Sequence, residues 1–321
     1  SFCSETRGLS RLPWVDNTLD PQAIWDIPTF TWVPQPSTVF KHIKCLNKGT
    51  MLLVGPSGTS EKKIAFIDPP PVLSSIGDFV EYTRSAVTNA VQKRLLSEVP
   101  IGCFLSGGID SSIVTKVASD QNRSLKTFTV GFENSRDPYG HGSSDESVEA
   151  ESFARELGTD HHKILASSCL FREYLDDFVR HGDQPFGVPS GLGIFAISKL
   201  AQQMRVKVLL SGDCADECFG GYSWYPHLEL PGSGRGSKQR NPGDVTFSSF
   251  NRPLEERLAA IGSMDAHTRA YAWHYYGSEE DKFEIFNRDF FAECRSSLRH
   301  FSRFKSDHIW KPRDFVDQDR D

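Results

Sequence analysis

Two short polar motifs, each directly after an apolar run, most constrain what this chain can fold into. The first is Ser-Gly-Gly-Ile-Asp-Ser-Ser at residues 106–112, which follows the apolar run 101–105. The second is Ser-Gly-Asp-Cys-Ala-Asp-Glu at residues 211–217, which follows the apolar run 206–210 and continues into Phe-Gly-Gly-Tyr at 219–222. Parallel strands present their carboxyl ends at one edge of a sheet, where α/β proteins bind ligands. We therefore expect both motifs to line one site.

The pattern around these motifs alternates between strand and helix. Helices are predicted over residues 76–98, 146–157, 170–179 and 192–204, with a further helix after the first motif; strands are predicted over 101–105, 127–132, 162–165 and 206–210. Alternating elements of this kind form right-handed crossovers and a parallel sheet that is covered on both faces. The sequence therefore predicts an α/β fold with a parallel twisted sheet and helices on both faces.

The first seventy residues have a different texture. Short β-rich runs such as 51–54 and 64–67 alternate with turn signals, and Asp-Pro-Pro-Pro at 68–71 is typical of a stiff linker. We place the domain boundary there and expect one domain at 1–70 and another at 71–321. Within the second domain, residues 231–242 are predicted as a glycine-rich loop, and residues 254–261, 268–276 and 283–291 as helices.

The first motif is suited to binding a phosphate chain. Adjacent glycines bring backbone N–H groups close to a ligand, and hydroxyls and a helix N-terminus complete an anion-binding nest. A simpler alternative is a Gly-Gly turn in which Asp110 or Ser111 only caps the helix. The expected phosphate-binding residues are Ser106, Gly107, Gly108, Asp110, Ser111 and Ser112.

A carboxylate inside an anion-binding nest would repel phosphate unless a cation lay between them. We therefore expect Asp110 to bind Mg²⁺, a hard cation that prefers oxygen ligands, and Asp216 to supply a second carboxylate from the other motif. The motif lacks Gly-Lys-Ser/Thr, so it is not the loop that transfers a γ-phosphate.

Composition excludes several classes of protein. The formal net charge of −6 argues against nucleic acid as the main partner, and no apolar run is long enough to span a bilayer. No secretory signal is evident at the start of the chain. The seven cysteines are scattered and predict reduced thiols in a cytoplasmic protein rather than a disulfide framework. Cys214 and Cys218 could hold a metal, but no second pair at ligand spacing accompanies them.

Two other patterns are explained most simply by side-chain packing. Phe283, Phe286 and Phe290 recur at helical spacing, which indicates a core stripe rather than a surface that stacks nucleic-acid bases. His161 and His162 lie on a predicted strand. A packing role there is a simpler explanation for them than a role in acid–base catalysis.

Residues 106–112 resemble the pyrophosphate loop of ATP pyrophosphatases, and residues 211–222 resemble a signature of the glutamine-dependent asparagine synthetase family. The family signature is Ser-Gly-Glu-Gly-Ala-Asp-Glu-Leu-Phe-Gly-Gly-Tyr. Further similar stretches are Thr-Phe-Thr-Val-Gly-Phe at 127–132, Leu-Gly-Thr-Asp-His-His at 157–162, and Asp-Gln-Pro-Phe at 183–186. The resemblance extends from Phe2 to about Tyr222.

The resemblance implies an ATP pyrophosphatase fold (adenine nucleotide alpha hydrolase-like) and a ligase that makes asparagine. ATP would adenylate the side-chain carboxylate of aspartate with release of pyrophosphate, and ammonia would then displace AMP. At matching positions, the adenosine would be lined by Leu105, Val130, Ser211 and Gly212. Asp110, Asp213 and Asp216 would act in catalysis, with Asp110 and Asp216 on Mg²⁺.

The resemblance also implies that residues 1–70 are the β-rich remnant of an N-terminal nucleophile glutaminase domain. The synthetase domain would then be truncated at its C-terminal end, and helices would follow its parallel sheet. Ammonia would come from glutamine through a separate glutaminase partner, or be used directly, and a homodimer is a further option.

The chain departs from the family signature at Asp213, which replaces Glu, and at Cys214, which replaces Gly. Gln184 likewise replaces Glu in the segment at 183–186. Two alternatives therefore stay open. The chain could be another amide-forming enzyme, for example of β-lactam synthetase type, or an ATP-binding remnant that acts as a partner subunit.

Overall fold

A computed structural model of the chain describes residues 1–64, 73–133, 145–187, 190–221 and 275–301. These residues fall into two compact units. Unit 1 comprises residues 1–64, 182–187 and 275–301; unit 2 comprises residues 73–133, 145–181 and 190–221.

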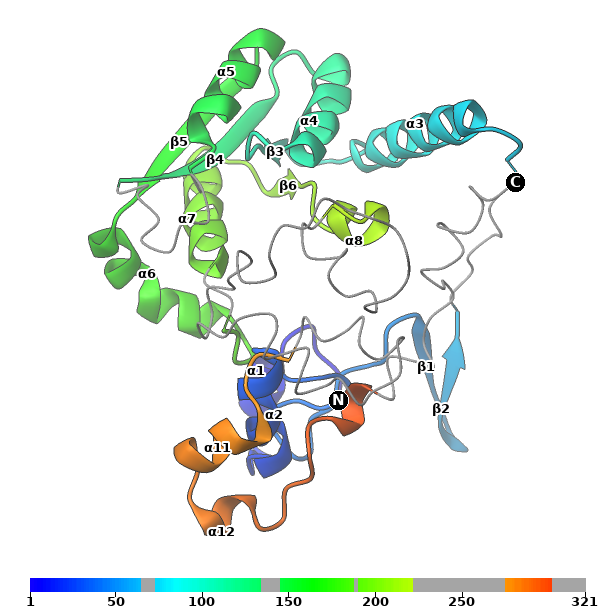
Figure 1. The fold of residues 1–321 in the computed structure, drawn as a ribbon. Coiled ribbons are helices and arrows are strands. Elements are labelled where there is room, and N and C mark those ends of the chain that lie inside the picture. The colour runs from blue at the N-terminus through cyan, green and yellow to red at the C-terminus, as the bar shows by residue number, and fades with distance from the viewer. Residues whose placement is uncertain (65–72, 134–144, 188–189, 222–274, 302–321) are drawn as a thin grey trace, which may run out of the picture. The chain divides into compact units, whose positions relative to one another are not determined.

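A four-stranded parallel sheet forms the centre of unit 2 (Figure 1). Its strands are β3 (Ile101–Phe104), β4 (Lys126–Phe132), β5 (Asp160–Ala166) and β6 (Val208–Leu210), in the order β5-β4-β3-β6. In the register, Cys103 lies opposite Thr127 of β4 and Leu210 of β6. Each predicted strand is present, with bounds that differ by at most two residues from the expectation.

Helices cover both faces of this sheet. They are α3 (Ile76–Arg94), α4 (Ile109–Gln121), α5 (Ser147–Leu157), α6 (Ser168–His181), α7 (Ser190–Gln203) and the short α8 (Ala215–Phe219). On one face, Val91 of α3 and Ala118 of α4 pack on Cys103. On the other face, Ile197 and Ala201 of α7 pack on Phe128. The predicted α/β fold with a doubly covered parallel sheet is therefore confirmed.

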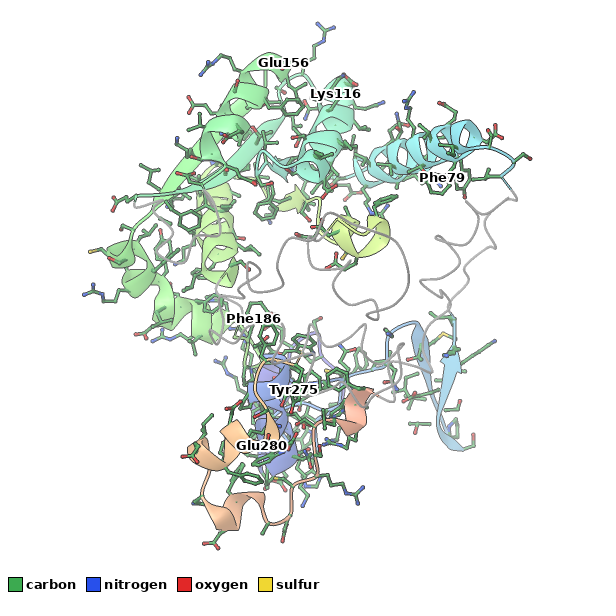
Figure 2. All side chains as sticks on the ribbon, viewed as in Figure 1. Phe79, Lys116, Glu156, Phe186, Tyr275 and Glu280 are labelled. Carbon is green, nitrogen blue, oxygen red and sulfur yellow. The ribbon has the colours of Figure 1, made fainter. Side chains whose placement is uncertain are left out.

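The outer sides of these helices carry the charged residues. Lys116 of α4 and Glu156 of α5 lie on the sides away from the sheet (Figure 2), and both are exposed. Lys116 pairs with Asp120 one helical turn later, at 2.5 Å. This division of apolar and charged faces is what places the helices against the sheet.

Unit 1 contains more helix than the sequence pattern predicted. Helices α1 (Thr6–Ser10) and α2 (Pro21–Phe30) precede a hairpin of β1 (Thr50–Gly55) and β2 (Gly58–Lys63). The expectation of a β-rich segment over residues 1–70 was wrong for its first half. Asp20 and Pro21 form a helix-start signal that the pattern analysis missed: the Asp20 carboxylate accepts from the N–H groups of Gln22 and Ala23.

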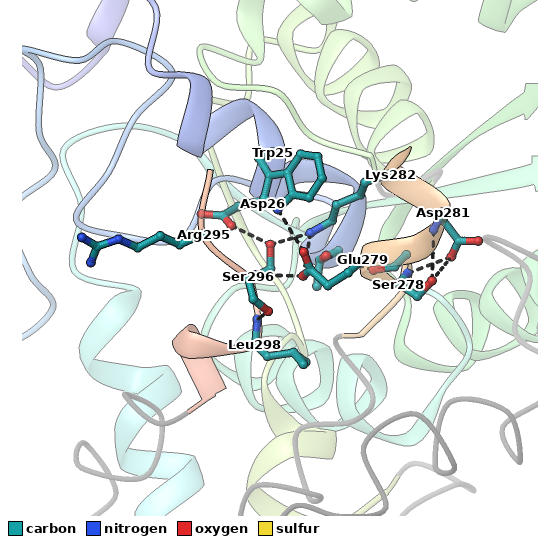
Figure 3. A network of polar contacts seen from close by, with 12 residues as sticks. Trp25, Asp26, Ser278, Glu279, Asp281, Lys282, Arg295, Ser296 and Leu298 are labelled. Atoms are coloured by element: carbon teal, nitrogen blue, oxygen red, sulfur yellow. Dashed lines mark hydrogen bonds and ion pairs between the residues drawn. The ribbon is translucent and has the colours of Figure 1, made fainter. Parts of the chain in front are cut away.

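A buried polar network joins α2 to residues 278–300 of unit 1 (Figure 3). Asp26, which is 2% exposed, accepts hydrogen bonds from Ser297 at 2.6 Å and from His300 at 2.9 Å. Arg299 pairs with the same carboxylate at 2.8 Å. Burial raises the pKa of Asp26, but the hydrogen bonds from His300, Ser297 and Arg299 outweigh it and leave the pKa below its usual value.

Lys282 adds a buried cation to this network. Its side chain is fully buried, and its Nζ donates to Glu279 at 3.1 Å and to Ser297 at 2.6 Å. The same Nζ lies 4.9 Å from the centre of the Trp25 ring, whose Nε1 donates to Glu279. Buried charges are tolerated when they are paired in this way.

The predicted aromatic stripe lies on two short helices rather than one. Helix α11 (Glu279–Ile285) ends before Phe286, and α12 (Arg288–Phe291) follows. Phe283 and Phe286 contact the Trp25 ring, with centroids 5.8 Å and 5.6 Å apart. Phe283 is nevertheless 51% exposed, so the prediction of a core stripe is wrong for this residue.

Several other predictions lie outside the described residues. They are the linker at 68–71, the loop at 231–242, the helix at 254–261 and most of the helix at 268–276. Tyr275 and Tyr276, the described end of the last one, are not helical. In the part of the chain that the structure describes, no helix has both the length and the apolar character needed to cross a membrane.

Candidate nucleotide site

The two sequence motifs lie at a switch point of the sheet. From β3 the chain crosses to β4 on one side, whereas β6 lies on the other side of β3. Ligands of open α/β sheets bind outside the carboxyl ends of the strands where the order reverses in this way. Residues 105–108 follow β3 and residues 211–214 follow β6, so both motifs start at this point (Figure 1).

The first motif is held in shape by two of its own hydroxyls. Ser111 Oγ accepts from the backbone N–H of Ser106 at 3.1 Å and donates to the carbonyl of Gly108 at 3.2 Å. Ser106 Oγ contacts Ser111 Oγ at 3.0 Å and accepts from Gly108 N–H at 3.2 Å. Ser111 is buried whereas Ser106 is exposed. These two hydroxyls therefore hold the loop in shape, and their predicted contact with phosphate stays a prediction.

The N-terminus of α4 is open toward this loop. Its N-cap is Gly108, which has no side chain to cap the first turn. The first N–H groups of a helix have no intrahelical acceptor, so they are available to an anion. Asp110, in the same turn, is half-buried, and Ser112 donates from its backbone N–H to Gly108 at 3.1 Å.

The start of α5 forms a wall beside the loop that sequence analysis missed. Gly107 has a φ of 89°, and a Cβ at this position would lie 2.8 Å from the carbonyl oxygen of Glu146. Asp145 accepts from Ser147 N–H at 3.0 Å and fixes this end of the helix. The sequence pattern predicted a helix over 146–157 but gave no signal for its contact with the loop.

Gly212 brings the second motif against the first. A Cβ built on Gly212 would lie 2.6 Å from the backbone nitrogen of Ser111 and 2.8 Å from the carbonyl carbon of Asp110. Only glycine allows this approach, because real Cβ contacts are essentially never shorter than 3.0 Å. The two turns are thus in direct backbone contact.

Asp110 and Asp216 form the acidic part of the site. Burial raises the pKa of Asp216, and the negative charges of Asp110 and Glu217 raise it further. Asp110 is therefore close enough for its charge to act on Asp216. The side chain of Asp216 folds over Gly221, since a Cβ there would be 2.0 Å from Asp216 Oδ1.

The donor set fits a divalent cation that is shared with a phosphate ligand. Mg²⁺ is usually bound by one or two carboxylates together with substrate phosphates and water. Asp110 and Asp216 supply two carboxylates, and among the described residues no group of three or more His, Cys, Asp or Glu side chains is arranged as a complete metal site.

The remaining predicted residues of the second motif are exposed or half-buried. Asp213 is exposed and accepts from Ser211 Oγ at 2.9 Å. Cys214 is the N-cap of α8 and has a φ of 73°, in the left-handed region that favours glycine. Burial and the charges of Glu217 and Asp213 raise the pKa of its thiol. All seven cysteines are free, in agreement with the prediction that there is no disulfide framework.

Leu105 directly follows β3 and Val130 lies in β4, and both side chains pack against buried residues of unit 2. Leu105 is 1% exposed, packs with Ala150 and Ala154 of α5, and donates from its N–H to Phe128 at 2.9 Å. Val130 packs into the core on the α7 side of the sheet. Their predicted contact with adenosine stays a prediction, as do the other ligand contacts.

The segment at 183–187 lies in unit 1. Asp183 accepts from the N–H groups of Thr6 at 2.9 Å and of Arg7 at 3.0 Å, and so caps α1. Gln184 accepts from Val39 N–H at 2.9 Å and donates to Thr6 Oγ1 at 2.9 Å. Both the oxygen and the nitrogen of the Gln184 side-chain amide are thereby hydrogen-bonded.

Comparison with known proteins agrees with this description. The family described as asparagine synthase matches residues 83–313. Asparagine synthetase [glutamine-hydrolyzing] 1 of Bacillus subtilis (strain 168) is 35% identical over 225 residues, which cover 70% of this chain and 34% of that protein. A putative asparagine synthetase [glutamine-hydrolyzing] of Mycobacterium bovis is 30% identical over 282 residues, covering 84% of this chain and 41% of that protein.

Other similarities are more distant. Amidase chyE of Penicillium rubens is 29% identical over 249 residues, covering 67% of this chain and 36% of that protein. The chain thus spans between a third and about two fifths of the length of these relatives. The solved NMN synthetase of Francisella tularensis aligns with a TM-score of 0.31 at 18% identity, over 46% of this chain and 58% of that chain, which is too low to support an argument.

Proposed function

The chain belongs to the asparagine synthase family, and we propose on this basis that it catalyses ATP-dependent amide synthesis. In the proposed reaction, an oxygen of the aspartate side-chain carboxylate attacks the α-phosphorus of ATP and pyrophosphate leaves. The nitrogen of ammonia then attacks the activated carbonyl carbon, and AMP leaves as asparagine forms. Amide bond formation is thus coupled to cleavage of ATP into AMP and pyrophosphate.

One observation supports this proposal most strongly: the backbone contact of Gly212 with Asp110 and Ser111. It puts the open N-terminus of α4 and the carboxylates of two strand ends beside one another. In the proposal, the first-turn N–H groups of α4 bind the β- and γ-phosphates and hold the leaving pyrophosphate. Mg²⁺, when bound by Asp110 and Asp216, would neutralise part of the charge that develops on the leaving group.

Asp213 is proposed to act on the attacking ammonia. Its carboxylate is exposed and is oriented by Ser211 Oγ at 2.9 Å. The carboxylate can accept a proton from the ammonium that forms when nitrogen attacks the carbonyl. Leu105, Val130, Ser211 and Gly212 are proposed to line the adenosine.

The test is release of pyrophosphate by the purified chain with ATP, Mg²⁺ and ammonium, with and without L-aspartate. The proposal expects release that depends on aspartate, with AMP and asparagine as the other products. L-Glutamate, one methylene longer, is the matched control acid and should give much less product. Release that ignores aspartate but needs another acid would identify a different amide-forming enzyme, and ATP binding without release would identify a binding subunit.

The source of the ammonia and the assembly are further parts of the proposal. Glutamine-derived ammonia supplied by a glutaminase domain or partner would be consumed at this site, and a homodimer is an alternative assembly. We also propose a cytoplasmic location with ATP and small molecules as ligands. The source of the ammonia is tested by comparing the rate of asparagine formation with ammonium and with glutamine as the nitrogen donor.

A further inference from the structure

A polar pocket apart from the two turns lies on unit 2, between α5 and the start of β5. It has a volume of about 380 Å³ and is lined by Glu151, Arg155, Thr159, His161 and Lys163. His161 is the second residue of β5, where the strands begin, whereas the turns with Asp110 and Asp216 follow strand ends. The pocket is therefore separate from the nucleotide site.

A chain of hydrogen bonds determines the tautomer of His161. Thr159 Oγ1 donates to the carbonyl of Ala154 at 3.3 Å, so its oxygen accepts the proton of Thr127 Oγ1, 3.0 Å away. Thr127 Oγ1 then has no second proton to offer and accepts from His161 Nδ1–H at 2.9 Å. Each hydroxyl has one proton, and this is the arrangement that satisfies all three bonds. His161 Nε2 is consequently an unprotonated acceptor.

This acceptor is left without a partner. His161 Nε2 is shielded from solvent and makes no hydrogen bond among the described residues. Burial lowers the pKa of the imidazole, which favours the neutral ring. A buried polar atom without a partner is destabilising and calls for an explanation.

The charges around the pocket are complementary to a zwitterion. Glu151 lies 3.4 Å from Arg155 and 3.5 Å from Lys163, distances at which a surface ion pair contributes little. Arg155 and Lys163 provide donors for a carboxylate. Glu151 and His161 Nε2 provide acceptors for an ammonium group, and they would disfavour a plain anion without N–H donors.

We propose that this pocket binds the zwitterionic head of a free amino acid. Its carboxylate accepts from Arg155 and Lys163, and its ammonium group donates to Glu151 and to His161 Nε2. Entry of the ligand replaces the Glu151 pairs with Arg155 and Lys163, which lie at 3.4 Å and 3.5 Å. The site is thus distinct from the proposed nucleotide site, and its occupancy does not require ATP.

The experiment uses glycine, the smallest such zwitterion, and the whole chain with ¹⁵N-labelled histidine. Glycine should shift the Nε2 resonance of His161 in a saturable way. Trimethylglycine, which carries the same charges but no N–H donor, should bind about tenfold more weakly or worse. Tight binding of trimethylglycine or of inorganic phosphate, or no saturable shift with glycine, would overturn the proposal.

Two variants locate the binding to these residues. Lys163→Gln should weaken glycine binding by about tenfold through loss of one charge-assisted bond. His161→Phe should do the same, while His162→Phe, which changes a ring that stacks on Phe128 with centroids 5.3 Å apart, should leave glycine binding unchanged. Thermal unfolding of each variant shows whether it is folded, and unchanged binding in folded Lys163→Gln protein would contradict the assignment.

Discussion

Gly212 and Ser111 approach each other so closely that a Cβ on Gly212 would lie 2.6 Å from the Ser111 nitrogen. This contact joins the turn after β6 to the first turn of α4. It has two consequences: the turn after β6 tolerates no side chain at this point, and the carboxylates of the two motifs are brought within electrostatic reach of one another. The proposed nucleotide site depends on this contact.

Gly212→Ala should separate the two turns. The new methyl group would meet backbone atoms that cannot rotate away, which is expected to cost about 1–3 kcal/mol of stability and to weaken ATP binding. Chemical denaturation and ATP titration measure the two effects. Gly77→Ala in α3 is the control, because its new Cβ would be in ordinary contact at 3.5 Å; it should leave ATP binding unchanged and should not lower stability.

Asp110→Asn should remove the magnesium dependence of ATP binding. The substitution preserves shape but takes away one of the two carboxylates, so adding Mg²⁺ should no longer raise the affinity for ATP. ATP titration with Mg²⁺ and with a chelator gives this comparison. Asp120→Asn, on the exposed side of the same helix, is the matched control; if Asp110→Asn responds to Mg²⁺ as the unaltered chain does, the metal assignment is wrong.

The raised pKa of Asp216 predicts the sign of a pH effect on stability. A carboxyl group whose pKa is higher in the folded state stabilises that state fully below its unfolded pKa. This contribution is lost as the pH rises through the folded pKa, which lies above 3.8 for Asp216. Urea unfolding across this range should therefore show a fall with rising pH that Asp216→Asn lacks. An identical pH profile in both proteins would contradict the raised pKa of Asp216.

Cys214→Gly should stabilise the turn before α8. A non-glycine residue in the left-handed region destabilises the folded state by about 1–2 kcal/mol. Glycine removes this strain but loses more backbone entropy on folding, which offsets about 0.5–1 kcal/mol of the benefit. We therefore expect the free energy of unfolding to rise by about 0.5–1 kcal/mol. Cys214→Ala removes the thiol but keeps the strained φ of 73°, so it should show no such gain. Equal stability of the two variants would assign the effect to the thiol instead.

Asp26→Asn should destabilise unit 1. It leaves Arg299 and His300 beside a neutral group, and loss of one member of a buried ion pair typically costs about 3–5 kcal/mol. Because the pKa of Asp26 is lowered in the folded state, its contribution is present above the unfolded pKa and is lost as the pH falls through the folded pKa. The free energy of unfolding of the variant should therefore depend less on pH in acid. Asp176→Asn, at an exposed carboxylate, is the control.

Much of unit 2 was predictable because its elements follow from local patterns. Apolar runs four to six residues long, separated by amphipathic segments, are enough to predict strands, helices and a parallel sheet. Helix α2 was missed because its start signal at Asp20 and Pro21 was overlooked among many turn-forming residues. The single helix predicted over 283–291 breaks at Phe286 and Asn287, since Phe286 packs on Trp25 in an extended conformation.

The site was predictable in residue type but not in geometry. The motifs identified the acidic and glycine residues because phosphate and magnesium chemistry requires those types in that order. The use of Ser106 and Ser111 inside the loop, and the wall provided by Glu146, depend on hydrogen bonds and contacts that no spacing rule contains. The same holds for Asp183, which caps a helix that begins 177 residues earlier in the chain.

The amino-acid sequence alone determined the order of strands and helices along the chain and the two turns of the proposed site, because hydrophobic periodicity and glycine placement are local properties. Only the tertiary structure decided which groups meet. The contact of Gly212 with Ser111, the charge of Asp110 acting on Asp216, and the unpaired Nε2 of His161 each arise between segments brought together by packing. Such contacts are set by the balance of burial and hydrogen bonding over the whole unit, which a single stretch of sequence does not contain.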